Sequence, residues 1–361
     1  MTGERNYHVF YMLCKAAAEV RDPIGLASWQ DYAILNQAGT VAEVTTWNDQ
    51  AEFRDMHAAL LKLGFSEKQR SEMYLMLATC CHLGNVSFSS TSSGGSEVSN
   101  PAQLAKCAQM LQVNEASLAS AVTHRTMGGG AIEEYKKPLE APQAETARNS
   151  LLMHIYSLVF DWCVEVINDY IAVPRAEACI GVLDIFGFEN FSLNSFPQLC
   201  INFTNESLHN LFIEHVFKLE QQTYVQEEVD WNFVDYEDNQ HTLDLIAKRP
   251  MCILGQLDEA CTNQASTDKS LLQNLHSVFG AKKTGAKSYV VPKRSADRTF
   301  AIVHYAGEVV YAIEGFVEKN KDALSKDITL VSLAPSNPLL PAKPCPERHF
   351  RPSVYSFKFS T

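Results

Sequence analysis

The chain has 361 residues, of which 46% are hydrophobic, and a formal net charge of −12. A chain of this length can bury one large core or two to three ordinary ones. Acidic residues outnumber basic residues 42 to 30, which argues against a nucleic-acid binder, because affinity for phosphate backbones comes from clustered lysine and arginine. The ten cysteines have no metal-ligand spacing and no CxxC motif, which favours a reducing cytosol.

Targeting and membrane signals are the next features to consider. No apolar run approaches the roughly 18 residues that span a membrane, so we expect no membrane span. The first segment, "MTGERNYHVFYMLCK", carries Glu4, Arg5 and His8 where a signal peptide needs an unbroken apolar region. We therefore expect a cytoplasmic protein.

Residues 1–85 are predicted to be mainly helical, because their apolar positions recur at helical spacing. Adjacent Cys80, Cys81 and His82 point in different directions on a helix and have no second pair of ligands, so we interpret them as core residues rather than a metal site. The polar run Ser87–Asn100 is predicted to be a surface loop or hairpin tip.

A second exposed hairpin is predicted in "THRTMGGGAIEEYKKPL", where Gly128–Gly130 interrupt any periodicity. Three glycines can cradle a phosphate, but no Lys-Ser or Lys-Thr follows them, which favours a turn. A long helix is then expected from about Gln143 to Ile171, with one buried apolar face.

The segment "ACIGVLD" is a continuous apolar run, typical of a strand that is covered on both faces, and it ends at Asp184. Open α/β sheets bind ligands at the carboxyl ends of their strands. A carboxylate there can hold Mg²⁺ through water, and Gly187 would let a backbone N–H approach a phosphate. The local pattern leaves two interpretations open: a phosphate site, or a capping acid followed by a tight turn.

A long helix is predicted from about Ser195 to Tyr224, with Ser195 or Asn194 capping its start. About 30 residues at about 1.5 Å each form a rod of roughly 45 Å. We expect its buried stripe to consist of the apolar residues Phe196, Leu199, Cys200, Phe203, Leu208, Leu211, Phe212, Val216 and Leu219.

The run "LDIFGFENF…NSFPQLCINFTNESLHNLFIEHVFKLEQQTY" resembles the second switch and relay helix of the myosin motor domain. Three further stretches agree in order: "GERNYHVFY", "LDEACTNQASTDKSLLQNL" and "HYAGEVVYAIEGFVEKNKDAL". The resemblance implies an α/β fold, namely the mostly helical part of a P-loop-type motor head, with a few central-sheet strands and a long relay helix. The chain would be a central fragment, from just after the first switch to the loop after the "EKNKD" helix.

The resemblance also implies ATP and Mg²⁺ as cofactors. Asp184 would position Mg²⁺ through its water shell, and the N–H of Gly187 would donate to the γ-phosphate. Glu189 would pair with an arginine of the first switch and close the site around the attacking water. Gly187 and Glu189 are therefore the expected catalytic residues, in a site that works by positioning and electrostatics.

The actin filament is the partner that the resemblance implies. Its expected contacts are the hairpin Thr126–Pro138, the helix-loop-helix from about Cys252 to Leu275, and the basic loop "GAKKTGAKSYVVPKRSADR". On composition alone that loop is equally well an ordinary solvated loop. The expected actin-binding residues are Lys136, Lys137, Lys282, Lys283, Lys287, Lys293 and Arg294.

The sequence departs from the family pattern in its phosphate-binding residues. None of the 17 glycines is followed by lysine, so the GxxxxGK[ST] loop is absent, as is the Ser-Ser-Arg of the first switch. Enzymatic activity is therefore left open. We expect part of an actin-based, ATP-driven motor of the cytoplasm and cytoskeleton; the alternatives are a truncated, non-catalytic actin-binding protein without its own ATP site, and an incomplete gene model.

The expected domain organisation is a partial motor domain, 1–332, followed by a proline-rich tail, 333–361. Pro335, Pro338, Pro341 and Pro344 recur every third residue, the repeat of a polyproline II helix, which can dock polyproline-reading domains or form a plain linker. Within the motor part we expect an upper helical region (1–175), a switch strand and loop (176–192), the relay helix (193–230) and a lower actin-binding region (231–332).

Overall fold

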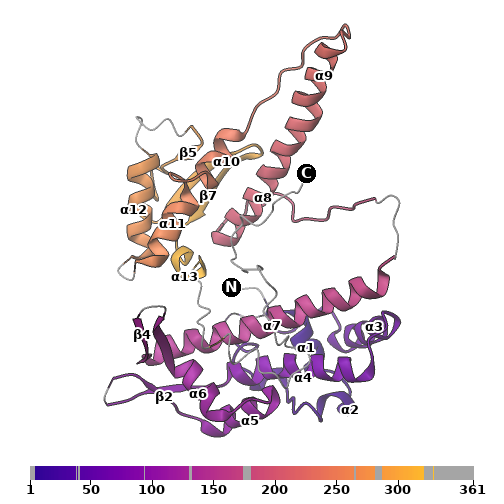
Figure 1. Ribbon diagram of the computed structural model, residues 1–361, viewed down its shortest axis with the longest axis vertical. Helices are drawn as coiled ribbons and strands as arrows, with labels where there is room; N and C mark the ends of the chain where they lie inside the picture. The colour runs from indigo at the N-terminus through magenta and orange to yellow at the C-terminus, as the bar shows by residue number, and fades with distance from the viewer. Residues whose placement is uncertain are drawn as a thin grey trace. The chain divides into compact units, whose positions relative to one another are not determined.

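The computed structural model describes residues 5–37, 39, 41–92, 94–129, 132–173, 180–263, 266–280, 287–320 and 328. These fall into two compact units (Figure 1): among the described residues, the first unit contains 5–173 and 328, and the second contains 180–320. Lys282, Lys283 and the proline-rich tail lie outside the described residues, so the predictions for them are not tested.

The first unit is mainly helical, as its periodicity predicts. Local signals explain where its helices begin: Asn48 accepts from the N–H groups of Gln50 and Ala51, and Ser66 forms a capping box with Gln69. Its elements are α1 (His8–Cys14), α2 (Ala18–Arg21), η1 (Trp29–Asp31), α3 (Asp49–Lys62), α4 (Glu67–Gly84), β1 (Phe88–Ser90), β2 (Ser96–Val98), α5 (Pro101–Leu111), α6 (Glu115–Thr123), β3 (His124–Gly129), β4 (Ile132–Pro138) and α7 (Ala141–Ile171).

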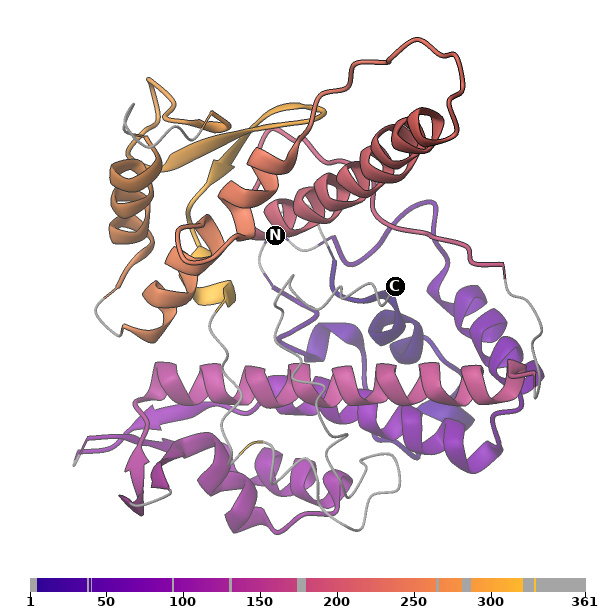
Figure 2. The same cartoon turned by 45° about the horizontal axis from the view of Figure 1, so that its top comes forward.

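The core of this unit lies between α4 and α7, which run side by side (Figure 2). Leu151, Ile155 and Val159 repeat every four residues on α7 and are buried, as the helical spacing predicts. Cys80 and Cys81 are buried on α4, and His82 is also buried, so their interpretation as core residues is confirmed. Both predicted hairpins are present, as β1–β2 and β3–β4.

The expectation that no segment approaches a membrane span is not confirmed, because of helix α7. It has 31 residues, and its most apolar 18-residue window has a mean hydropathy of 1.5, which is long and apolar enough to cross a membrane. Its inner face packs into the core of the first unit, whereas Met153, Phe160 and Val164 are exposed. A core helix of a globular unit meets the same length and hydropathy criterion, so this finding is weak evidence for a span.

The second unit packs helices against a three-stranded antiparallel sheet of order β5-β6-β7. Phe300, buried at the centre, stacks on Tyr289 and on Tyr311 from the neighbouring strands. The elements are α8 (Phe196–Phe212), the π-helix η2 (Ile213–Leu219), α9 (Glu220–Gln226), α10 (Gln240–Ala247), α11 (Ile253–Thr262), α12 (Asp268–Phe279), β5 (Tyr289–Val290), β6 (Thr299–His304), β7 (Gly307–Ala312) and α13 (Phe316–Asn320).

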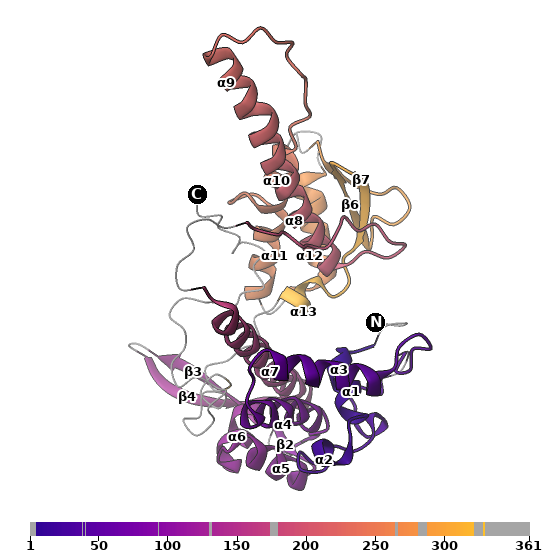
Figure 3. The same ribbon diagram turned by 90° about the vertical axis from the view of Figure 1, so that its right-hand side faces the viewer.

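The predicted long helix is present as α8, η2 and α9, which follow one another in line (Figure 3). Its start agrees with the predicted capping, because the N–H of Ser195 donates to Gln198 Oε1 at 2.9 Å. The seven-residue π-helix in its middle was not predicted. Helices of this kind are rare and occur frequently at functional sites.

The strand predicted in "ACIGVLD" is wrong for the residues that are described. Residues 180–193 belong to no helix or strand, and the side chains of Ile180 and Val182 are 97% and 92% exposed. A strand buried on both faces needs neighbouring strands and covering helices. Within the described ranges, no strand pairs with residues 180–184.

Candidate functional site

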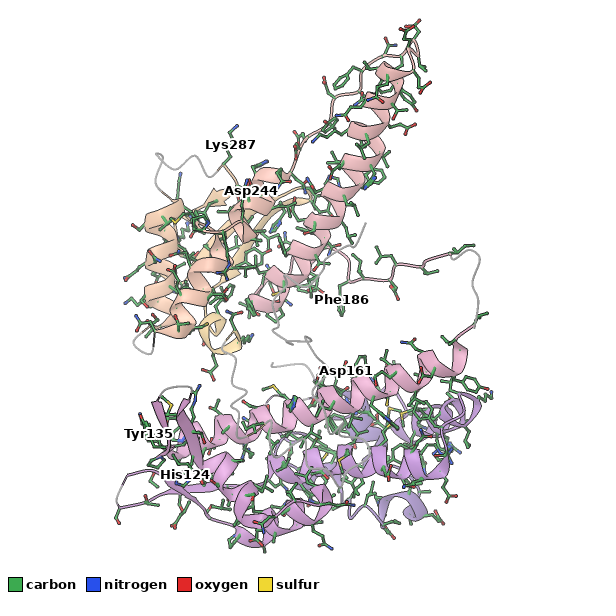
Figure 4. The ribbon with its side chains drawn as sticks, viewed as in Figure 1. His124, Tyr135, Asp161, Phe186, Asp244 and Lys287 are labelled. Atoms are coloured by element: carbon green, nitrogen blue, oxygen red, sulfur yellow. The ribbon has the colours of Figure 1, made fainter. Side chains whose placement is uncertain are left out.

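Asp184, Gly187 and Glu189 lie on one segment without regular secondary structure, residues 180–193, which precedes α8. Figure 4 labels Phe186 on this segment. The Asp184 carboxylate is exposed and makes no hydrogen bond or ion pair with any residue that the structure describes. A Cβ added at Gly187 would meet no atom within 4 Å. The first half of the segment therefore presents a free carboxylate and an accessible backbone.

The second half of the segment is fixed by contacts from α8 and the sheet. The side chain of Asn202 accepts from the N–H of Glu189 at 2.8 Å and donates to its carbonyl oxygen at 2.7 Å. The Glu189 carboxylate accepts from Gln198 Nε2 at 3.3 Å. Phe188 packs edge-on against His304, with ring centroids 5.4 Å apart. The Glu189 carboxylate is thus presented from a backbone that α8 holds in place.

The donor set at this site fits one hydrated divalent cation better than a protein-built metal cage. Among the described residues, no three His, Cys, Asp or Glu side chains come together to hold a metal ion. Mg²⁺ keeps several waters and is usually bound through one or two carboxylates plus substrate phosphates. A single exposed carboxylate at Asp184 agrees with that mode of binding.

Several residues that the sequence reasoning missed form a buried polar network behind Glu189. Its side chains are 0–5% exposed and come from α8, β6, β7 and the residue before α10. The members are Asn202, Glu206, Asn239, His304 and Tyr311. Their signal in the sequence is that Asn202 and Glu206 stand at helical spacing from Phe196 and Leu199, on the face that α8 buries.

The expected apolar stripe of this helix is correspondingly wrong in its second half. Phe212, Val216 and Leu219 are exposed, whereas Asn202, Asn205 and Glu206 are buried. The buried polar residues are tolerated because each has hydrogen-bond partners, for example Phe186 O, which accepts from Asn205 Nδ2 at 2.9 Å.

The Tyr311 hydroxyl of this network keeps its proton and can act as a hydrogen-bond donor. Burial raises the pKa of Tyr311 well above its usual range, and this outweighs the opposing effect of the hydrogen bond from Asn202. The hydroxyl therefore keeps its proton at physiological pH. Burial likewise raises the pKa of the nearby Cys200 thiol to about 12, so that this cysteine is not a reactive thiolate.

The basic residues predicted to bind actin are found in both units. In the hairpin β3–β4, Lys137 lies directly opposite Arg125, and Lys136 Nζ donates to Ser120 Oγ at 2.6 Å. Like charges opposite each other destabilise a hairpin, so stability alone does not explain this pair. Figure 4 labels Tyr135 in the same strand, β4.

In the second unit, the described residues that are predicted to bind actin lie in the segment around β5. Lys287, Lys293 and Arg294 are all exposed (Lys287 is labelled in Figure 4). The segment is fastened to α12 by His276, whose ring nitrogens lie 2.8 Å from Tyr289 Oη and 2.9 Å from the carbonyl oxygen of Ala296. The loop thus presents its positive charges from a fixed base.

Comparisons with known proteins agree with this arrangement. The family model described as myosin head (motor domain) matches residues 1–343. The chain is 37% identical over 344 residues to unconventional myosin heavy chain 6 of Caenorhabditis elegans, and 40% identical over 336 residues to the myosin-I heavy chain of Dictyostelium discoideum. It is 39% identical over 324 residues to myosin-8 of Arabidopsis thaliana.

These matches cover 94%, 91% and 88% of the chain, but only 16%, 14% and 21% of the respective relatives. The chain therefore spans a small part of the curated proteins that it matches. The matched range includes residues 180–193, α8 and the hairpin β3–β4. The chain belongs to the myosin head (motor domain) family.

Proposed function

We propose that this chain forms part of an actin-based motor in which ATP hydrolysis drives movement along the filament. The observation that carries the proposal is the arrangement of Asp184, Gly187 and Glu189: an exposed carboxylate, an accessible glycine and a carboxylate on a held backbone follow one another within six residues. Membership of the myosin head family supports this assignment.

The roles follow from the environment of each residue. Asp184 would orient Mg²⁺ through water, and Mg²⁺ when bound neutralises charge on the phosphate oxygens. The backbone N–H of Gly187 would donate to the terminal phosphate, because no side chain crowds that approach. Glu189 would close the site by pairing with an arginine, its direction being set by Asn202 and Gln198.

We further propose that α8, η2 and α9 act as the relay that carries a change at Gly187 to a distant surface. The supporting contact is at its start, where Asn205 Nδ2 on α8 donates to the carbonyl oxygen of Phe186 at 2.9 Å. A shift of the neighbouring Gly187 would therefore be felt directly by the helix. Two packed arrangements of such a rod can convert a small displacement into a larger one.

Actin binding is proposed for the two basic surfaces, the hairpin with Lys136 and Lys137 and the loop with Lys287, Lys293 and Arg294. An acidic filament would attract them despite the negative net charge of the whole chain. Lys282 and Lys283 belong to the same proposal from the sequence. A cytoskeletal location and docking of polyproline-reading domains to the tail remain sequence-based proposals.

The nucleotide assignment is tested by Gly187→Ala, with Gly181→Ala as its matched control. A Cβ at either position meets no atom within 4 Å, so neither substitution should disturb folding. Only Gly187→Ala would place a methyl group at the proposed phosphate contact. We expect it to slow ATP hydrolysis by the complete protein at least about tenfold, because the methyl group would keep the Gly187 N–H from the phosphate, and the loss of one such hydrogen bond typically costs about 10²–10³.

The measurement is the burst of phosphate formed on the protein, detected by rapid mixing with Mg-ATP and acid quenching. Wild type and Gly181→Ala should give equal bursts, and Gly187→Ala a much smaller one. Equal bursts from all three proteins would show that Gly187 does not contact the reacting phosphate.

A further inference from the structure

The backbone of Glu189 is held by a forked contact from a single side chain. Asn202 is fully buried, and its amide group makes two hydrogen bonds to Glu189, one to the N–H and one to the carbonyl oxygen. Because the N–H must meet an oxygen and the carbonyl must meet an NH₂ group, these two bonds fix which way the amide is oriented. The second hydrogen of Asn202 Nδ2 points to Tyr311 Oη at 2.9 Å.

Tyr311 in turn belongs to a directed chain of hydrogen bonds. Its hydroxyl lies 2.9 Å from His304 Nε2, and His304 Nδ1 lies 2.7 Å from Glu206 Oε2. A carboxylate accepts only, so Nδ1 donates to Glu206, and in the neutral imidazole Nε2 is then the acceptor. The Tyr311 hydroxyl therefore donates to His304 and accepts from Asn202.

Glu206, at the other end of this series of hydrogen bonds, also has its hydrogen-bond partners. Glu206 also accepts from Asn239 Nδ2 at 2.6 Å and from the N–H of Tyr305 at 3.3 Å. Every side chain in the network is buried, so water cannot replace a lost partner, and a lost partner leaves a costly unsatisfied group. Such a network has one low-energy arrangement, and it ends on the Glu189 backbone.

We propose that Asn202, oriented by the Tyr311 hydroxyl, is the positioning residue for Glu189. This rests on the proposed function of Glu189 in closing the nucleotide site. Residues 180–187 have few contacts with the described chain, so the fork from Asn202 largely determines where the Glu189 carboxylate points. His304 and Glu206 act behind Tyr311 by keeping its hydroxyl aligned.

The test is Tyr311→Phe, with Tyr289→Phe as a matched control. Both tyrosines are buried, both stack on Phe300, and both hydroxyls bind a histidine, but only that of Tyr311 contacts Asn202. Each substitution removes one oxygen and leaves the aromatic ring in place. The two variants therefore lose similar packing, and only Tyr311→Phe removes a hydrogen bond from Asn202, whose amide holds the Glu189 backbone.

The first readout is hydrogen–deuterium exchange of the Glu189 amide in the whole chain, resolved by fragmentation. We expect exchange to be roughly three- to tenfold faster in Tyr311→Phe than in wild type and unchanged in Tyr289→Phe, in line with the net worth of one hydrogen bond. The amides of Ala301 and Ile302 in β6 report global opening and serve as the internal reference.

The second readout is ATP hydrolysis by the complete protein, where Tyr311→Phe should lower kcat severalfold with little change in KM. Unchanged Glu189 exchange in Tyr311→Phe, or equal acceleration in Tyr289→Phe or at β6, would overturn the proposal. Faster exchange with an unchanged kcat would also overturn it. If the complete protein hydrolyses no ATP, the proposed function fails, while the exchange experiment still decides whether Tyr311 and Asn202 hold Glu189.

Discussion

Glu206 and His304 lie 2.7 Å apart, from Oε2 to Nδ1, although 98 residues separate them in the sequence. Neither side chain is exposed. The contact joins α8 to the end of β6 and therefore ties the helix that holds the Glu189 backbone to the sheet. A buried carboxylate is stable only while its donors remain in place.

We predict that His304→Leu destabilises the second unit far more than Glu206→Gln. The first variant leaves the buried Glu206 carboxylate without its histidine donor, which costs about 3–5 kcal/mol. The second replaces the charge by a neutral amide that can still bind neighbouring groups, which costs about 1–2 kcal/mol. Hydrogen exchange of the β6 and β7 amides under native conditions measures both free energies. Equal losses would mean that no charge is buried at this contact.

A second relationship concerns His82 in the first unit. Its Nε2 lies 3.1 Å from the carbonyl oxygen of Gly25 and so carries the proton, while Nδ1 lies 3.3 Å from Gln103 Nε2 and accepts. Burial, assisted by the charge of Lys106, lowers the pKa of His82 to about 4. An unfolded histidine has a pKa of about 6.5. The unfolded chain therefore binds this proton first as the pH falls.

We predict that the stability contributed by a neutral His82 is fully present above about pH 6.5, declines as the pH falls, and stops declining below about pH 4. In His82→Gln, which does not titrate, the first unit should lose less stability between pH 7.5 and pH 5 than in wild type. Urea unfolding at the two pH values measures the difference. His57 and His154, whose pKa values are also lowered by burial, remain in both proteins and cancel. Parallel losses in the two proteins would contradict the assignment.

A third prediction concerns Gly84, the last residue of α4. Glycine inside a helix is normally about 0.5–1 kcal/mol less stable than alanine, so Gly84→Ala should stabilise the protein on helix propensity alone. Here a Cβ would collide with Ile34 Cγ2, which lies against the helix in the core. We expect net destabilisation of about 1–3 kcal/mol, as in other overpacked cores.

A double-mutant cycle tests whether the collision with Ile34 causes the destabilisation. In an Ile34→Ala background the obstructing methyl group is gone, so Gly84→Ala should become neutral or stabilising there. Thermal unfolding of the four proteins gives the coupling energy between the two positions. A coupling near zero would show that Ile34 does not explain the glycine.

The sequence predicts those parts of the fold that depend on neighbours along the chain. The helix from 143 to 171 has a local apolar period, and Ser195 or Asn194 is expected to cap the start of the next long helix; the structure has α7 over Ala141–Ile171 and Ser195 as the N-cap of α8. The role of Asn202 could not be predicted in this way, because its partner Tyr311 is 109 residues away. A period of 3.6 locates a buried face, but a polar residue on that face is recognised only when its partners are known.

The strand predicted at residues 180–184 also shows that a local pattern cannot determine contacts with distant segments. Its apolar composition is typical of a strand covered on both faces, but pairing depends on other segments, and no strand in the described ranges lies against it. The assignments of Asp184, Gly187 and Glu189 came from resemblance, whereas the accessible backbone at Gly187 and the fork on Glu189 came from the structure. Local pattern identified the segment, and tertiary contacts explain how it is held.

The final prediction separates stability from binding in the hairpin β3–β4. Lys137 faces Arg125 across the strands, so two positive charges repel each other in the folded hairpin. Lys137→Glu would create an opposite-charge pair at this position and should leave the stability of the first unit unchanged or raise it by about 0.2–1 kcal/mol. If the hairpin binds actin through its positive charge, the same substitution should weaken binding severalfold, with a smaller dependence on salt.

Co-sedimentation with actin filaments at several salt concentrations, together with urea unfolding, measures both effects on the same protein. Lys62→Glu is the matched control, because Lys62 is an exposed lysine in the last turn of α3, and its substitution changes the net charge by the same amount. Equal weakening by the two variants would indicate that only net charge matters. If Lys137→Glu binds actin as well as wild type does, the hairpin is not part of the actin-binding surface. Weaker binding without a loss of stability would show that the positive charges of Arg125 and Lys137 serve an anionic partner.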